Sequence, residues 1–209
     1  MDHGASLIVL DRDGVLNRTV PNPAEPRPDS PLRAAEVAIF PWVPATLRRL
    51  TDAGFGLVIA SNQPAWAKGK AARADLDDVH RLIVDGAQSA GGVILSSHLC
   101  FHRAEDGCAC RKPKTGLLEQ AFRQHPGFDP AASWMVGDRI TDVLCGAGFG
   151  LRTALLGTPE ARAAELSLLV PGQGQASSLQ PSSLHPSSLH PSFRGGDLRD
   201  FVDYLLGPG

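Results

Sequence analysis

The segment SLIVLDRDGV, from Ser6 to Val15, decides how this chain is expected to fold. Its apolar half is typical of a short buried strand, and two carboxylates follow at once. Asp11 and Asp13 repel each other unless a cation or a shared proton compensates. Mg²⁺ suits this position, because it takes one or two carboxylates together with phosphate oxygens and waters. Gly14 lets the backbone turn sharply away from the strand end. The segment therefore predicts a strand that leads into a magnesium site.

Apolar runs alternate with helix-compatible stretches along the rest of the chain. We expect strands at 6–10, 56–60, 93–95, 134–136 and 153–156, and helices at 44–53, 73–90, 116–125 and 141–147. This alternation predicts an α/β fold, in which a mostly parallel, Rossmann-like sheet carries helices on both faces. Ligands in such folds bind at the carboxyl ends of the strands. The candidate site residues below are expected at that edge.

Length and composition limit the classes of protein that need to be considered. The 209 residues fit one domain, with 43% hydrophobic and 20% charged residues. A net charge of −2 argues against nucleic acid as a partner. No apolar run approaches the ~18 residues of a membrane span, and the N-terminus does not read as a secretory signal. We therefore expect a cytoplasmic protein without a membrane partner, and a monomer.

Three further segments carry residues suited to chemistry on a phosphate. Ser61 follows the second apolar run and offers a hydroxyl to a phosphoryl oxygen. Lys112 lies in a basic run and offers a cation that neutralises the transferring phosphate. Asp138 can supply a further magnesium ligand, and Asp142 can anchor that motif or hold Lys112. Each signal is weak alone, but all of them in this order are far less expected by chance than any one of them.

This order, D-R-D-G-V-L-N followed by Ser, Lys and D-x-x-x-D, resembles the haloacid dehalogenase (HAD) superfamily of phosphohydrolases. The resemblance implies a HAD-like fold in which Asp11 attacks phosphorus and Asp13 acts as general acid and base. It implies that Ser61 and Lys112 stabilise the phosphoryl group. Magnesium would be held by Asp11, the backbone oxygen of Asp13 and Asp138, with Asp142 in support.

A compact group of cysteines and one histidine lies just before the basic run. Cys100, His102, Cys108 and Cys110 offer three thiolates and one imidazole within eleven residues. This set matches a closed tetrahedral zinc site with no open position, so we expect a structural Zn²⁺ in the loop 100–110. The alternatives are an unligated reduced loop and a redox pair formed by Cys108 and Cys110.

The string C-F-H-x₅-C-A-C-R-K-P-K-T-G resembles the zinc loop of the D-glycero-D-manno-heptose 1,7-bisphosphate phosphatases and the related histidinol-phosphate phosphatases. The resemblance spans about residues 7–156 and implies no large cap domain. It implies substrate contacts by Thr19, Val20, Pro21, Asn22, Ser61, Asn62, Gln63, Pro64, Arg111, Lys112 and Arg139. The family usually reads T-N-Q-S-G where this chain has S-N-Q-P-A, so Pro64 is a departure.

The chain organisation follows from composition shifts. We expect a phosphatase domain over residues 1–160, including a Pro-rich loop at 21–31 that is either a plain surface loop or faces the substrate. Tandem SSLQP and SSLHP repeats predict a disordered insertion at 171–194. A last amphipathic helix at 197–206 is expected to pack back on the domain.

These observations predict a magnesium-dependent phosphatase for a small phosphorylated sugar or metabolite. A heptose 1,7-bisphosphate is the leading substrate, because Arg111 and Lys112 can handle two phosphates. Histidinol phosphate or another small phosphorylated metabolite is the alternative within enzymes. A catalytically inactive, zinc-stabilised binding module is less well supported, since Asp11, Asp13, Lys112 and Asp138 are all intact. A nucleic-acid 3′-phosphatase is less well supported because it needs a positively charged groove, whereas this chain has a net charge of −2 and a single Tyr.

Overall fold

The computed structural model describes residues 5–23, 27–169 and 190–209. Their strands form one sheet of six, in the order β3-β2-β1-β4-β5-β6, and every neighbouring pair is parallel. The strands are β1 (Leu7–Leu10), β2 (Gly56–Asn62), β3 (Ile94–Cys100), β4 (Trp134–Gly137), β5 (Arg152–Leu156) and β6 (Phe193–Gly195). The expected parallel α/β architecture is confirmed.

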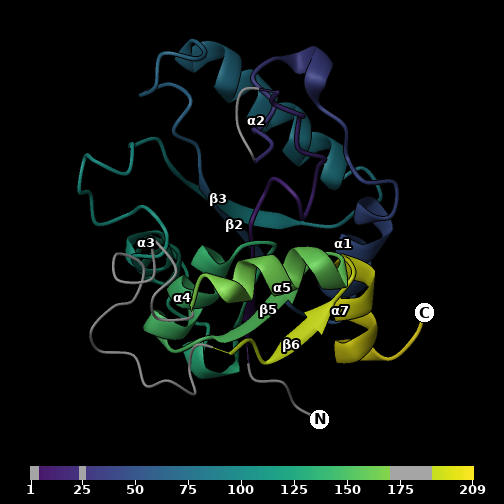
Figure 1. The fold of residues 1–209 in the computed structure, drawn as a ribbon. Helices are drawn as coiled ribbons and strands as arrows, with labels where there is room; N and C mark the ends of the chain where they lie inside the picture. Colours follow the sequence, from purple (N-terminus) through teal and green to yellow (C-terminus); the bar gives the residue numbers. More distant parts are fainter. Residues whose placement is uncertain (1–4, 24–26, 170–189) are drawn as a thin grey trace.

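Helices connect and cover these strands (Figure 1). They are α1 (Val43–Asp52), α2 (Arg73–Ala87), α3 (Gly116–Gln124), α4 (Ile140–Phe149), α5 (Pro159–Ser167) and α7 (Leu198–Leu206). Two short 3₁₀ turns lie at Ala34–Glu36 and Pro130–Ala132. Among the helices of the described ranges, none has the length and apolar character needed to cross a membrane.

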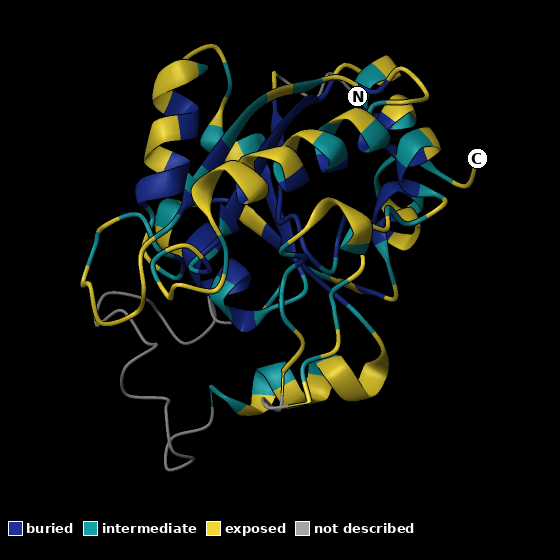
Figure 2. Cartoon of the chain, turned by 90° about the horizontal axis from the view of Figure 1, so that it is seen from above, coloured by how far each residue is buried: buried dark blue, intermediate teal, exposed yellow. Residues whose placement is uncertain are grey.

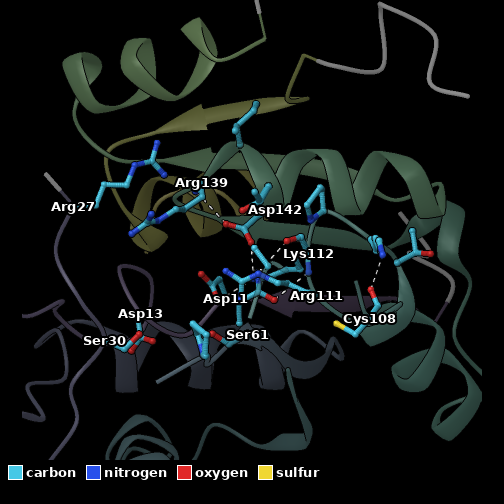
Figure 3. Close-up of a pocket in the computed structure, with 18 of the residues that line it drawn as sticks. Asp11, Asp13, Arg27, Ser30, Ser61, Cys108, Arg111, Lys112, Arg139 and Asp142 are labelled. Atoms are coloured by element: carbon cyan, nitrogen blue, oxygen red, sulfur yellow. Dashed lines mark hydrogen bonds and ion pairs between the residues drawn. The ribbon is translucent and has the colours of Figure 1, made fainter. Parts of the chain in front are cut away.

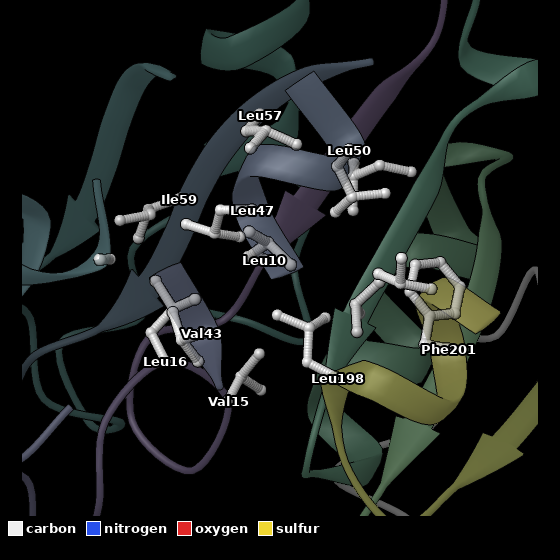
Figure 4. Close-up of a cluster of buried hydrophobic side chains, with 14 of the residues drawn as sticks. Leu10, Val15, Leu16, Val43, Leu47, Leu50, Leu57, Ile59, Leu198 and Phe201 are labelled. Atoms are coloured by element: carbon white, nitrogen blue, oxygen red, sulfur yellow. The ribbon is translucent and has the colours of Figure 1, made fainter. Parts of the chain in front are cut away.

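The alternation of side chains along β1 divides the core into two layers. Ile8 and Leu10 face α1, α2 and α7, whereas Leu7 and Val9 face α3 and α4. Figure 4 shows the first layer, in which Leu10 of β1 meets side chains of α1, β2 and α7. Because both faces are covered, every residue of the central strands β1 and β4 is buried, and the centre of the sheet appears dark blue in Figure 2.

The largest differences from the expected elements lie at the edges of the sheet. β3 continues to Cys100, five residues beyond the expected end of that strand. Its extension contains Ser96, Ser97 and His98, and such polar residues are tolerated because β3 is an edge strand. The helix α5 was not expected, because none of its residues is fully buried and its apolar pattern is correspondingly weak.

The C-terminal part of the chain completes the sheet rather than following it. Phe193 and Arg194, placed by sequence in the disordered insertion 171–194, lie in β6 beside β5. Residues 171–189 of that expected insertion lie outside the described residues. The helix α7 packs against α1 and β6, with Leu198, Phe201 and Val202 buried. The sheet therefore extends beyond the expected domain limit at residue 160.

Candidate active site

Three carboxylates meet where β1 and β4 end. Asp11 follows β1 directly, Asp138 follows β4, and Asp142 lies in the first turn of α4. One carboxylate oxygen from each lies within 4.8 Å of the other two. Gly14 has φ +90°, and any side chain there would overlap the Asp138 carboxylate. The tight turn predicted from the first motif is thus what lets the β4 loop approach β1.

Buried negative charge shifts the pKa of two of these acids. Burial, reinforced by the charges of Asp11 and Asp142, raises the pKa of Asp138 well above its ordinary value. Burial also raises the pKa of Asp142 to about 6, although the neighbouring Lys112 opposes this shift. Asp138 Oδ1 is buried and has no hydrogen-bond partner in the described part of the chain. The cluster therefore has the oxygen ligands and the excess negative charge that Mg²⁺ binding compensates.

Lys112 lies between two of the carboxylates (Figure 3). Its side chain is 3% exposed, and its Nζ lies 3.0 Å from Asp11 Oδ1 and 2.5 Å from Asp142 Oδ1. A third contact joins Nζ to the carbonyl oxygen of Ala60 at 2.8 Å. Burial alone would lower the pKa of Lys112, but the two carboxylates outweigh it and raise the pKa. The two carboxylates therefore favour the charged ammonium form of Lys112 beside Asp11.

The backbone of Lys112 is fixed by Asn62 at the end of β2. The Lys112 N–H donates to Asn62 Oδ1, and Asn62 Nδ2 donates to the Lys112 carbonyl, both at 3.0 Å. Lys112 does not directly follow a strand, unlike Asp11 and Asp138, because β3 ends at Cys100. Lys112 lies in the loop after β3, and its hydrogen bonds with Asn62 hold it at the end of β2.

Asp13 has a separate set of partners on the other side of the strand end. Its carboxylate accepts hydrogen bonds from Arg12, Asn17 and Gln63. Burial pushes the pKa of Asp13 upward, but the charge and hydrogen bonds of Arg12, with the two amides, outweigh it and lower the pKa. Arg12 and Asn17 were not singled out from the sequence, because their roles depend on contacts that only the fold defines.

A cavity of ≈ 1350 Å³ opens over these residues. The predicted site residues that line it are Asp11, Asp13, Thr19, Ser61, Asn62, Pro64, Arg111, Lys112, Arg139 and Asp142, together with the candidate zinc ligand Cys108. Lys68, which sequence analysis did not assign to the site, also lines the cavity. Lys68, Arg111 and Arg139 form no ion pair with any carboxylate of the described residues. The cavity therefore offers several cations to an anionic ligand.

Four predicted substrate contacts lie outside this cavity lining. Val20, Pro21 and Asn22 line a neighbouring cavity of ≈ 340 Å³ instead. They are held there because Val20 pairs with Asp29 through the backbone and Asn22 Nδ2 donates to Asp29 Oδ2. Gln63 is 1% exposed and lies beneath Asp13. The structure thus does not support direct substrate contact by Gln63.

The Pro-rich loop is attached to both sides of the cavity. Asp29 pairs with Lys70 after β2 at 2.7 Å, and Arg27 pairs with Glu165 of α5 at 3.0 Å. The other carboxylate oxygen of Glu165 accepts the N–H of Ile140, at the start of α4. Of the two interpretations of this loop, the structure supports the one in which it faces the site, since Arg27 and Asp29 line the cavity.

The four zinc-ligand candidates converge at the mouth of the cavity. Their sulfur atoms lie 3.2–3.7 Å apart, and His102 Nδ1 lies 3.3 Å from Cys110 Sγ. Four ligands at ~2.3 Å around one ion would be about 3.8 Å apart, whereas a disulfide needs about 2.0 Å. Burial, followed by the hydrogen bond with Cys110, raises the pKa of Cys100 to about 12. The geometry fits one tetrahedral cation rather than a disulfide.

The cysteine loop is joined closely to the residues that follow it. Lys114 Nζ donates to the carbonyl oxygens of Gly107 and Cys108, and Arg111 Nη1 donates to that of His102. Gly116 begins α3, and a side chain there would collide with the backbone of Ala109. The loop, the basic run and the start of α3 therefore form one packed unit.

Comparison with known proteins identifies the family. A family model described as HAD-hydrolase-like matches residues 109–180. A D-glycero-beta-D-manno-heptose-1,7-bisphosphate 7-phosphatase of Pseudomonas aeruginosa is 34% identical over 170 residues, which cover 74% of this chain and 87% of that protein. The chain belongs to the HAD phosphatase family that includes this enzyme. It is a hydrolase acting on phosphomonoesters, as the sequence resemblance predicted.

The wider matches agree with this family membership. The crystal structure of D,D-heptose 1,7-bisphosphate phosphatase from B. bronchiseptica, complexed with magnesium and phosphate, has a TM-score of 0.73 and 30% identity, and the match covers 96% of this chain and 98% of that one. The histidine biosynthesis bifunctional protein HisB of Legionella pneumophila is 35% identical over 136 residues, covering 65% of this chain and 37% of that longer protein.

Proposed function

We propose that this HAD phosphatase removes a phosphate, the one on C7, from D-glycero-D-manno-heptose 1,7-bisphosphate. The observation that carries the proposal is the composition of the cavity. Lys112 Nζ lies 3.0 Å from Asp11 Oδ1, and further cations line the same cavity. Lys68, Arg111 and Arg139 are not neutralised by carboxylates of the described residues, so a second phosphate has partners besides Lys112. The names of the relatives support the same substrate class.

The residues divide the reaction into two displacements. A carboxylate oxygen of Asp11 bonds to phosphorus while the bond from phosphorus to the sugar oxygen breaks, and Asp13 gives that oxygen a proton. A water molecule then attacks the aspartyl phosphate, losing a proton to Asp13 as the bond to Asp11 breaks. Ser61 and Lys112 stabilise the phosphoryl oxygens in both steps. Inorganic phosphate leaves, and both aspartates return to their starting forms.

Two metal ions complete the proposal. Asp11, Asp138 and the backbone oxygen of Asp13 would hold Mg²⁺, with Asp142 engaged by Lys112 at 2.5 Å. Bound magnesium supplies positive charge that neutralises the phosphoryl oxygens during transfer. Cys100, His102, Cys108 and Cys110 would hold a structural Zn²⁺ that keeps Arg111 and Lys112 in place.

Phosphate release from the purified protein tests this function. Heptose 1,7-bisphosphate and histidinol phosphate are compared with Mg²⁺ present, with Asp11→Asn as the blank. We expect kcat/KM to favour the heptose by ~100-fold or more, equivalent to about 2.7 kcal/mol of transition-state discrimination. Equally weak hydrolysis of both esters would leave the phosphatase activity in place and discard the heptose assignment. Preference for histidinol phosphate would instead support the alternative function, a histidinol-phosphate phosphatase.

A further inference from the structure

Gln63 makes contacts that the reaction described above does not use. Its amide nitrogen Nε2 donates to Asp13 Oδ2 at 2.6 Å and to Ser61 Oγ at 3.1 Å. Its oxygen Oε1 accepts from Arg12 Nη2 at 2.7 Å. The backbone N–H of Gln63 donates to the carbonyl oxygen of Cys100 at 2.7 Å. One buried side chain therefore connects a buried arginine with two groups that act on the phosphate.

The orientation of the Gln63 amide follows from the chemistry of Arg12. A guanidinium group can only donate hydrogen bonds, so the Gln63 atom beside it must be the oxygen. The NH₂ group must then face Asp13 and Ser61, and both of its hydrogens are used. Arg12 is 1% exposed and is itself fixed by a salt bridge to Asp13 at 2.9 Å. The amide cannot flip without leaving buried polar groups unpaired.

This orientation determines what the Ser61 hydroxyl can do. Because Gln63 donates to Ser61 Oγ, the hydroxyl acts as an acceptor on that side. Its own proton is left to donate in another direction, and Ser61 lines the cavity above Asp11. A phosphoryl oxygen in the cavity therefore meets a hydroxyl that is already turned to donate.

The carboxylate of Asp13 is fixed by the same network. Oδ1 accepts from Arg12 Nε at 3.1 Å and Asn17 Nδ2 at 2.8 Å. Oδ2 accepts from Arg12 Nη2 at 2.9 Å and Gln63 Nε2 at 2.6 Å. These four donors occupy both oxygens and hold the ionised carboxylate in one plane at the edge of the cavity. One of them must give way when Asp13 takes up the proton that it passes to the leaving oxygen.

We propose that Gln63, supported by Arg12, is a positioning residue that sets the Asp13 carboxylate and the Ser61 hydroxyl relative to each other. The inference rests on the proposed function, because it assigns Gln63 a role in that reaction. It differs from the expectation for this position, which was direct contact with the substrate. Gln63 acts on proton transfer to the leaving oxygen, through Asp13, rather than on affinity for the sugar.

The dependence of rate on the leaving group tests this assignment. A sugar alkoxide needs a proton from Asp13 as it leaves, whereas 4-nitrophenolate does not. The ratio kcat/KM reports the steps up to release of the leaving group, so hydrolysis of the aspartyl phosphate does not enter. We expect Gln63→Met to lower kcat/KM by ~100-fold for heptose 1,7-bisphosphate and by less than ~10-fold for 4-nitrophenyl phosphate. Phenyl phosphate should fall between them.

Matched variants separate positioning from a general loss of structure. Gln124→Met makes the same change at an exposed position of α3 and should leave both rates unchanged. In an Asp13→Asn background, Gln63→Met should no longer change the ratio of the two rates, since the group it positions is missing. Arg12→Lys keeps the charge but cannot contact both Asp13 and the Gln63 oxygen, so it should show the same leaving-group dependence as Gln63→Met. It replaces Gln63→Met in the test if that variant does not fold.

The outcomes that overturn the inference are distinct from failure of the proposed function. Equal losses for the heptose and the nitrophenyl ester in folded Gln63→Met would exclude a role through Asp13. A raised KM for the heptose with unchanged kcat would instead show that Gln63 contributes to substrate binding, as the sequence predicted. A wild-type protein that releases phosphate from none of the three esters would remove the proposed function and this inference together.

Discussion

At the scale of single residues, the site is governed by how buried charges are compensated. Lys112 neutralises Asp11 and Asp142 directly, whereas Asp138 has no cation at ion-pair distance among the described residues. Burial and the charges of Asp11 and Asp142 accordingly raise the pKa of Asp138. A carboxyl whose pKa is higher in the folded state opposes folding when it ionises, and this cost is present above its unfolded pKa. Asp138 is thus the position at which magnesium should matter most.

Asp138→Asn should therefore raise the melting temperature of the metal-free protein at pH 7. The same change should abolish stabilisation by magnesium, because a ligand is lost. For wild type at [Mg²⁺] of 100 Kd, binding adds about 2.7 kcal/mol, which corresponds to a rise in Tm of roughly 5–10 °C. Thermal denaturation with Mg²⁺ and with EDTA measures both effects. A variant whose Tm responds to Mg²⁺ as wild type does would exclude Asp138 as a ligand.

His80 on α2 gives a second prediction at this scale. Burial, followed by the charge of Arg12, lowers the pKa of His80 to about 4. Between pH 6.5 and about 4 the unfolded chain binds a proton that the folded chain does not, so stability falls as the pH falls. The shift corresponds to ~3 kcal/mol, reduced to about 2 kcal/mol by the partial exposure of the ring.

His80→Gln should lose this part of the pH dependence. Urea denaturation of wild type and variant at intervals from pH 7 to pH 4 measures it as the difference between two curves. We expect the curves to converge toward acid pH, with wild type losing about 2 kcal/mol more than the variant. Parallel curves would mean that His80 titrates alike in the folded and unfolded chain.

At the scale of elements, the cysteine loop connects β3 to α3 and brings Lys112 to β2. Its four ligand atoms converge, whereas Cys145 lies buried in α4 and donates to the Lys114 carbonyl. We expect Cys110→Ser to reduce bound zinc from one ion per chain to nearly none and to lower kcat at least ~10-fold, because Lys112 loses its support. Metal analysis and phosphate release measure the two effects.

Cys145→Ser is the matched control for the cysteine loop. It makes the same substitution outside the four-residue cluster, and its hydroxyl can still donate to Lys114 O. This variant should retain one zinc and most of the activity. If both variants kept full zinc, or if the purified wild-type protein held none, the zinc assignment would be wrong.

At the scale of the whole molecule, the C-terminal residues are part of the same core as the site. Phe201 of α7 is fully buried and packs edge-on against Trp134 of β4, with ring centroids 5.2 Å apart. It also meets Phe193 of β6 at 5.7 Å. Because Asp138 directly follows β4, the packing of α7 supports the strand that leads into part of the site.

Phe201→Ala should lower the free energy of unfolding by ~3–5 kcal/mol, since it leaves a large cavity in the core. Tyr204→Ala on the same helix removes a ring that is 58% exposed, and should cost less than about 1.5 kcal/mol. Urea denaturation of the two variants measures the contrast. Similar small losses in both would mean that α7 is not integral to the folded core.

The sequence by itself determined the order of the chemical groups and the type of fold. Asp11 and the four candidate zinc ligands could be proposed from the sequence, because their partners are close along the chain or follow apolar runs that end at one sheet edge. The extension of β3 and the helix α5 were not predicted, because their residues are polar or half-exposed and carry a weak hydrophobic pattern.

Only the tertiary structure decided which of these groups touch. Lys112 reaches Asp11 because Asn62, 50 residues earlier, holds its backbone. Gln63 lies beneath Asp13, also 50 positions away, rather than facing the substrate. Such contacts depend on strand register and on how loops cross the sheet edge, which are set by packing of the whole core. A motif specifies which chemical groups are present, and the distances between them follow from the fold.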